Sequence, residues 1–306
     1  MIKIENVTKK LDDHIALTNL SCEIPKGSVF GLIGPNGAGK STLLRAITGV
    51  YQTNEGSITI DGDLVFENPA AKNRLMYVPD ELYFLPGANM NRMAKMYAAF
   101  YNNFDPNRFA ELTDLFRLNP KENINKFSKG MKRQAAIILA LCTKAAYLFF
   151  DETFDGLDPV KRNLVRNLIA EDAIDNGTTV IITSHSLREL EDTCDQLALL
   201  HEGGIVFESD VQNLKTSLFK VQIAFLQPYD HRKFGDLKPL SFSKHGSVAN
   251  FIVRGDRDET YNVLSDLDPV LLEILPLSLE EVFIHEMENV GYSFADILGG
   301  EDNVQL

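Results

Sequence analysis

The sequence contains no tryptophan and only three cysteines, at Cys22, Cys142 and Cys194. They are far apart and match neither a CxxC motif nor a disulfide framework, so we expect buried free thiols in a reducing compartment. No apolar run approaches the roughly 20 residues that are needed to cross a bilayer. The longest, Ala135–Leu141 and Ala145–Phe150, have the lengths of a core helix and a core strand. We therefore expect a soluble chain with no membrane span, so any membrane process needs a second chain.

Basic side chains are also in the minority. The chain has 30 Lys and Arg against 43 Asp and Glu, for a formal net charge of −13. This balance argues against broad binding to nucleic acid or anionic lipid, although a local basic site stays open. The first residues, Met1–Glu5, lack the charged and then apolar layout of a signal peptide, so no leader is expected.

Short apolar runs alternate with helical patterns in the first part of the chain, which is typical of an α/β fold with a mostly parallel sheet. Ser28–Ile33 is an expected buried strand that leads into a glycine-rich turn, and Ser41–Thr48 is an expected helix. Near-continuous apolar runs indicate strands buried on both faces. The further expected strands are Ser57–Ile60, Leu75–Val78, Tyr147–Phe150 and Thr179–Thr183.

Between residues 83 and 144 the strand pattern disappears and helical spacing replaces it. Asp105-Pro106 has the form of a helix N-cap followed by proline at the first helical position. We expect these residues to form a helical insertion. The α/β domain that contains the insertion is expected to span residues 1–212.

A second pattern begins after the hairpin signal at Gly203-Gly204. Ser278 and Glu281 have the spacing of a capping box, in which each side chain satisfies the other residue's backbone N–H. Residues 213–290 are therefore expected to form a small α+β accessory domain, and residues 291–306 a flexible tail. The expected elements of the accessory domain are the strands Phe219–Phe225, Val248–Val253 and Leu271–Leu275, and the helix Glu259–Leu267.

The most specific motif is GxxxxGK[ST], which lies between an expected strand and an expected helix. Glycines permit a tight loop whose backbone N–H groups surround phosphates, and the helix N-terminus adds partial positive charge. Lys40 would neutralise the β- and γ-phosphates of a nucleotide, and the Ser41 hydroxyl would ligate Mg²⁺. The candidate ATP-binding residues are Gly34, Asn36, Gly37, Ala38, Gly39, Lys40, Ser41 and Thr42.

Two carboxylates end the apolar strand Tyr147–Phe150. Strand ends of such sheets face the ligand crevice, so Asp151 is a candidate metal ligand. Glu152 is a candidate catalytic base that would orient and polarise a water molecule, because phosphoryl transfer depends mainly on positioning and charge. His185 follows the strand Thr179–Thr183 and is expected to contact the γ-phosphate or the water.

The order of these motifs resembles the ABC ATPase family across roughly residues 1–210. The resemblance includes the segment Phe127–Gln134 (FSKGMKRQ) and the tripeptide Gly156-Leu157-Asp158. It implies a P-loop NTPase (RecA-like) sheet with a helical insertion, which binds and hydrolyses ATP with Mg²⁺.

The family's assembly implies further roles. The segment that matches the family signature, Ser128, Lys129 and Gly130, would contact ATP bound to the opposite subunit, and Asp158 would lie at the dimer interface. The implied partners are therefore a second copy of the chain, or a homologous ATPase subunit, arranged head to tail.

The chain departs from the family pattern at five positions. In the signature, Lys129 replaces a glycine and Met131 a glutamine, and the added cation could help to bind a phosphate. Asp80 stands where the family has a glutamine, and is a further candidate metal ligand. Leu11 replaces the aromatic residue that stacks on adenine, which puts the preference for ATP over GTP in doubt. Thr153 replaces a proline.

The stretch Ser278–Phe283 (SLEEVF) resembles the C-terminal part of ATPases that serve ABC-2-type bacterial exporters. It implies a partner in a separate chain, an integral membrane permease. It also implies a cytoplasmic location on the inner face of the membrane. The segment Leu82–Leu85 falls where the family has the groove that receives a permease helix; alternatively, its side chains pack inside the insertion.

Two other functions compete with the transport motor. A non-transport ABC ATPase that acts on ribosomes or DNA would generally have two fused cassettes, coiled coils or zinc sites, and none is evident here. A regulator, whose output is dimerisation rather than turnover, would differ in its ATPase rate.

Overall fold

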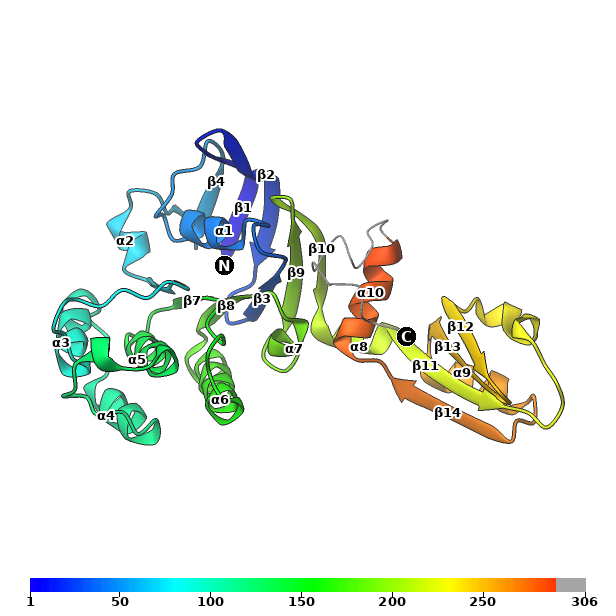
Figure 1. Ribbon diagram of the computed structural model, residues 1–306. Helices are drawn as coiled ribbons and strands as arrows, with labels where there is room; N and C mark the ends of the chain where they lie inside the picture. Colours follow the sequence, from blue (N-terminus) through cyan, green and yellow to red (C-terminus); the bar gives the residue numbers. More distant parts are fainter. Residues whose placement is uncertain (290–306) are drawn as a thin grey trace. The chain divides into compact units, whose positions relative to one another are not determined.

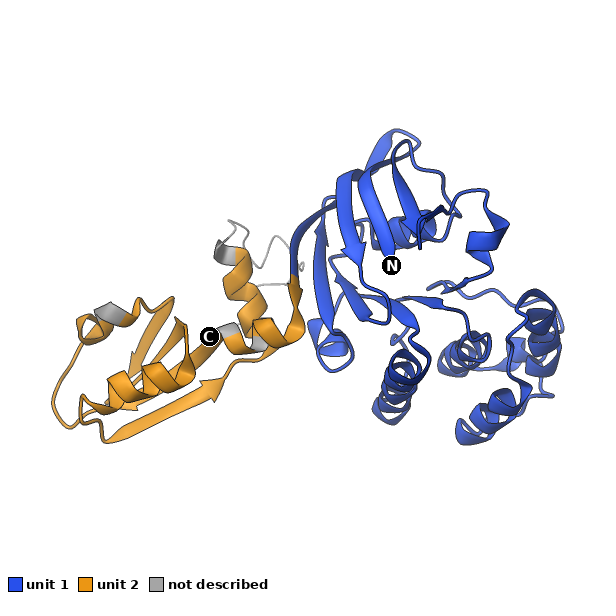
Figure 2. Cartoon of the chain, turned by 180° about the vertical axis from the view of Figure 1, so that it is seen from behind, with its two compact units in different colours: residues 1–208 blue, residues 209–306 orange. Residues whose placement is uncertain are grey.

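The computed structural model describes residues 1–289. The chain divides into two compact units, residues 1–208 and 209–306 (Figure 2). The boundary expected after residue 212 stays a prediction, and the expected tail at 291–306 lies outside the described residues.

A six-stranded sheet forms the centre of the first unit. Its core strands β3, β8 and β7 are parallel to one another and buried along their whole length, as their continuous apolar sequences predict. In spatial order the strands are β10 (Gly204–Asp210), β9 (Gln196–His201), β3 (Val29–Ile33), β8 (Thr179–Ser184), β7 (Tyr147–Asp151) and β6 (Leu75–Val78).

A second, antiparallel sheet packs over helix α1 (Lys40–Ile47), which lies between the two sheets (Figure 1). Buried and exposed residues alternate over much of its strands, as expected of a sheet with one face on the core. In spatial order the strands of this sheet are β2 (His14–Ile24), β1 (Ile2–Leu11), β4 (Glu55–Ile60) and β5 (Asp63–Leu64). Of these four strands, only the one at Glu55–Ile60 was expected from the sequence; β1, β2 and β5 were not.

The expected helical insertion is present, and α3 to α6 lie on the side of the six-stranded sheet opposite α1 (Figure 1). Asp105 caps α4 as predicted, because its Oδ1 accepts from the backbone N–H groups of Asn107 and Arg108, both at 3.0 Å. No helix within residues 1–289 is long and apolar enough to cross a membrane. The remaining helices of this unit are α2 (Pro69–Lys72), α3 (Met90–Phe100), α4 (Pro106–Leu115), η1 (Ile124–Lys126), α5 (Lys129–Cys142), α6 (Pro159–Asn176) and α7 (Leu187–Leu190).

The second unit contains an antiparallel sheet in the order β12-β13-β11-β14. The capping box is formed: Ser278 N–H donates to Glu281 Oε2 at 2.9 Å, and Glu281 N–H donates to Ser278 Oγ at 3.2 Å. The three strands and the helix that the sequence predicts in this part of the chain are present. The elements are α8 (Val211–Ser217), β11 (Leu218–Ala224), η2 (His231–Leu237), β12 (Ser241–His245), β13 (Val248–Arg254), α9 (Arg257–Ser265), β14 (Leu271–Pro276) and α10 (Leu279–Asn289).

Candidate functional site

The loop between β3 and α1 depends on glycine. Gly37 and Gly39 have φ angles of 85° and 107°, in the left-handed region that glycine adopts without strain. A Cβ atom on Gly34 would collide with the carbonyl oxygen of Leu200 in β9. The glycine-rich part of the GxxxxGK[ST] segment therefore forms the tight turn that the sequence predicts, and α1 begins at the lysine of the motif.

Lys40 is the first residue of α1, and only 6% of its side chain is exposed. Its Nζ donates to the carbonyl oxygens of Gly34 at 2.6 Å and Pro35 at 3.2 Å, and it lies 3.2 Å from Oε1 of Glu152. A buried ammonium group is costly unless it is paired, and these oxygens supply the compensation. The ammonium group thus lies in the loop, where a bound phosphate would need a positive charge.

Asp151 ends β7 and is almost fully buried. Its Oδ1 accepts from Ser41 Oγ at 3.1 Å and Thr183 Oγ1 at 2.7 Å, and its Oδ2 accepts from the Tyr77 hydroxyl at 3.0 Å. Burial, and then the Asp151 charge, raise the pKa of Tyr77, so this hydroxyl stays protonated. The paired oxygens of Ser41 and Asp151 are the hard ligands that Mg²⁺ prefers, so the expected metal-binding pair fits the ion.

Glu152 follows Asp151 in the left-handed region, with a φ angle of 46°. A non-glycine residue pays for this conformation, and such strain is concentrated at functional sites. The Glu152 N–H donates to Thr183 Oγ1 at 3.0 Å, and its Oε2 lies 3.0 Å from His185 Nδ1. Asp155 adds a third group, and all three side chains offer an atom within 4.8 Å of one another. The two candidate catalytic residues therefore lie in direct contact.

Of the side chains described above, Lys40, Ser41 and Glu152 border a cleft of about 340 Å³. It brings the glycine-rich loop and Glu152 together with Asp80 and the end of the β1–β2 hairpin. Among the described lining residues none is Phe, Tyr or Trp, and the one aromatic ring is the imidazole of His14. The lining residues are Leu11, His14, Ala16, Pro35, Asn36, Gly37, Gly39, Lys40, Ser41, Thr42, Asp80 and Glu152.

The cleft lining leads to a prediction about Leu11, which ends β1 and lines the cleft together with His14, the first residue of β2. Replacing Leu11 with tyrosine should lower KM for ATP about tenfold at unchanged kcat, because an aromatic ring stacks on a base. In the unsubstituted protein, where the only aromatic ring among the described lining residues is the small imidazole of His14, kcat/KM for ATP and GTP should differ by less than about tenfold. Ile15→Tyr is the matched control, since Ile15 does not line the cleft. An unchanged KM in Leu11→Tyr would contradict a base site at this position.

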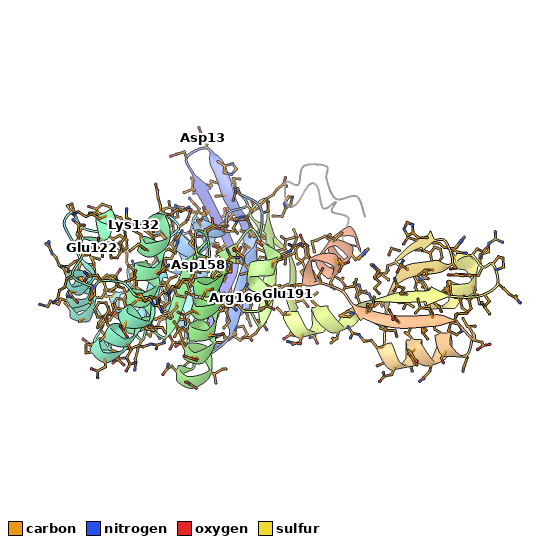
Figure 3. All side chains as sticks on the ribbon, turned by 60° about the horizontal axis from the view of Figure 1, so that its bottom comes forward. Asp13, Glu122, Lys132, Asp158, Arg166 and Glu191 are labelled. Carbon is orange, nitrogen blue, oxygen red and sulfur yellow. The ribbon has the colours of Figure 1, made fainter. Side chains whose placement is uncertain are left out.

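The signature residues lie elsewhere: none of them lines this cleft. Ser128 caps α5 by accepting from Met131 N–H at 3.2 Å, and a Cβ on Gly130 would lie 2.7 Å from the carbonyl oxygen of Gly156. Asp158 caps α6. Figure 3 labels Asp158 and, in α5, Lys132. The signature and the Gly156–Asp158 loop thus form one surface.

Asp80 lines the cleft, but its strongest contact is with the signature helix. Its Oδ1 accepts from Arg133 Nη2 at 2.7 Å, and Arg133 Nη1 donates to the Pro79 carbonyl oxygen at 3.0 Å. The side chain of Arg133 is 1% exposed and that of Asp80 is 55% exposed. The structure therefore gives Asp80 a partner that the sequence analysis did not foresee, and its role at the metal stays a prediction.

Sequence reasoning missed several residues of the site. Thr183 and Tyr77 supply hydroxyl groups to Asp151 from inside buried strands, where they looked like core residues. Their places at or near the carboxyl ends of parallel strands were the available signal. Arg133 lies within the signature segment itself, in the polar first part of α5, and its burial was not foreseen.

Comparisons with known proteins agree with this geometry. The family model for ABC transporters matches residues 17–155. The linearmycin resistance ATP-binding protein LnrL of Bacillus subtilis is 35% identical over 213 residues, which cover 67% of this chain and 68% of that protein. The lantibiotic transport ATP-binding protein SrtF of Streptococcus pyogenes is 32% identical over 240 residues, covering 74% and 98%. The ABC transporter ATP-binding protein YtrB of Bacillus subtilis is 28% identical over 284 residues, covering 93% and 97%.

Solved structures share the fold. An ATP-binding subunit of an ABC transporter has a TM-score of 0.65 at 23% identity, covering 70% of this chain and 92% of that one. The dimeric cassette MJ0796 bound to ADP and Pi has a TM-score of 0.63 at 21% identity, covering 69% and 99%. The predicted P-loop NTPase fold is confirmed. The chain belongs to the ATP-binding proteins of ABC transporters and is an ABC-type ATPase.

Proposed function

We propose that this chain binds Mg-ATP in the cleft beside Lys40 and hydrolyses it as a dimer that drives a separately encoded membrane permease, an exporter. The observation that carries the hydrolytic part is the position of Glu152. Its carboxylate lies between Lys40 and His185 and directly follows the buried Asp151.

The side chains have separable tasks in this proposal. Backbone N–H groups of the loop and Lys40 bind the phosphates, while Ser41 and Asp151 hold Mg²⁺, which would neutralise phosphate charge. Glu152 accepts the proton of the attacking water, and His185 holds the Glu152 carboxylate in place through the 3.0 Å contact.

The signature surface supports the dimeric part of the proposal. Ser128, Lys129 and Gly130 do not line the cleft of their own chain, so they are free to contact a nucleotide bound to another copy. Lys129 is exposed, and no carboxylate among the described residues forms an ion pair with its ammonium group. A cation at the first position of α5 suits a phosphate from a second chain.

An apolar groove supports docking of a permease. It has a volume of about 470 Å³ and lies between the end of α1, β6 and α3. The relatives named for lantibiotic transport and linearmycin resistance support export. We infer that the chain sits at the inner face of the cell membrane through this contact. Lining residues with exposed or half-buried apolar side chains include Val50, Met96, Tyr97 and Phe100.

None of the residues Leu82–Leu85, where the groove was expected, lines this groove. Phe84 is 7% exposed and packs inside the unit, as the alternative interpretation holds, whereas Tyr83 is 77% exposed. A Phe84 substitution would disturb the fold, so docking is better tested at Val50 and Phe100, which are 58% and 68% exposed.

The test of docking is a Val50→Ser, Phe100→Ser double variant. It should weaken co-purification with the neighbouring-gene membrane protein about tenfold, because apolar anchors carry most of the energy of such a contact. Its ATPase rate in the absence of the partner should not change. Ile174→Ser is the control, since Ile174 is 81% exposed but lies on α6, outside the groove. Equal co-purification of the double variant and the control would contradict docking here.

A further inference from the structure

One residue both lines the apolar groove and contacts the metal-binding carboxylate. Tyr77 lies in β6, the edge strand of the six-stranded sheet, beside Phe149 of β7. Tyr77 is one of the residues that line the groove between α1, β6 and α3. Its hydroxyl donates to Oδ2 of Asp151 at 3.0 Å.

The hydroxyl of Tyr77 has a specific task at Asp151. Oδ1 of this carboxylate accepts two hydrogen bonds, from Ser41 and Thr183, whereas Oδ2 accepts one, from Tyr77. A buried carboxylate with three fixed donors has a single orientation, and groups that orient a metal ligand set the affinity for the metal. Removal of the Tyr77 hydroxyl would leave Oδ2 without a donor and free the carboxylate to rotate.

We propose that Tyr77 is a positioning residue that holds Asp151 for Mg²⁺ and changes this hold when the groove is filled. The link to a partner depends on the proposed docking in the groove, but the effect on metal binding does not. A helix seated in the groove would contact the Tyr77 ring. Because the ring is rigid, a displacement at the groove moves the hydroxyl relative to Asp151.

Tyr101 provides a matched control. It lines the same groove, but its hydroxyl donates to the Leu75 carbonyl oxygen at 2.7 Å instead of to Asp151. Tyr77→Phe and Tyr101→Phe therefore make the same chemical change in the same groove, and only the first removes a hydrogen bond to the metal site.

The first measurement is the affinity of the full chain for Mn²⁺, used in place of Mg²⁺, in the presence of ATP. The EPR signal of free Mn²⁺ reports how much of the ion is unbound. Tyr77→Phe should weaken Mn²⁺ binding about tenfold, and Tyr101→Phe should leave it within about twofold. In turnover, Tyr77→Phe should raise the Mg²⁺ concentration at half-maximal rate more than it lowers kcat. Equal Mn²⁺ affinities for Tyr77→Phe and the unsubstituted protein would overturn the positioning role.

The second measurement tests the link to the groove with a double-mutant cycle. Val50→Trp places a large ring in the groove and should weaken Mn²⁺ binding at least about threefold when Tyr77 is present. In Tyr77→Phe the same substitution should have no further effect. Equal effects of Val50→Trp in both backgrounds, or none in either, would overturn the link. A different outcome would separate this inference from the proposed function. If neither the unsubstituted protein nor any variant hydrolyses ATP, but the Mn²⁺ affinities differ as expected, the proposed function fails and this inference stands.

Discussion

Glu152→Gln is expected to abolish ATP turnover while ATP stays bound. Glutamine keeps the size of the side chain, but it cannot accept the proton of the attacking water. Loss of a general base lowers kcat by about 100- to 10,000-fold. The measurement compares steady-state phosphate release with the amount of labelled ATP that the protein retains through gel filtration.

The control for this variant must account for backbone strain. Glu202, in the turn after β9, has the same φ angle of 46° as Glu152 and is exposed. Glu202→Gln therefore imposes the same side-chain change in the same conformation at a residue that does not line the cleft, and should keep the normal rate. Normal turnover in Glu152→Gln would show that another group acts as the base, and Asp155 would be the next candidate.

Asp80→Ala is expected to lower the free energy of unfolding and to raise the Mg²⁺ concentration needed for half-maximal ATPase activity. The variant removes the carboxylate partner of the buried Arg133, whose Nε already lacks a hydrogen-bond partner. A charged group left with an unsatisfied donor costs about 1–3 kcal/mol. Asp80→Gln should restore much of both properties, because its side-chain carbonyl oxygen is also an acceptor.

The two readouts of Asp80→Ala separate two roles. Denaturant unfolding reports the contact with Arg133, and the Mg²⁺ titration reports an action in the cleft. Unchanged Mg²⁺ dependence together with lower stability would leave Asp80 as a structural partner of the signature helix only.

The sequence predicted those parts of the site that local patterns specify. Residues 34–39 form a loop because of their own glycines, and Asp105 caps a helix through its nearest backbone N–H groups. Ser278 and Glu281 satisfy each other within one turn. Such contacts span only a few residues, so the sequence order contains the whole interaction.

Contacts between distant segments were not predictable in this way. The pairs Tyr77–Asp151 and Asp80–Arg133 join residues 74 and 53 positions apart in the chain. Their formation depends on strand order and on how α5 packs near the end of β6. The strand β1 was missed for a related reason. Its pairings with β2 and β4 contain register shifts, which interrupt the alternation of residues along the strand.

The central claim is that the nucleotide bound by one chain is held by the signature of a second. Light scattering of the Glu152→Gln protein with Mg-ATP tests it most directly. The account predicts a mass of twice the 34.2 kDa of a single chain with Mg-ATP, and the single mass without nucleotide. Adding Lys129→Glu, which places a negative charge at the signature, should return the protein to the single mass. A Glu152→Gln protein that binds ATP and stays at 34.2 kDa would contradict the account.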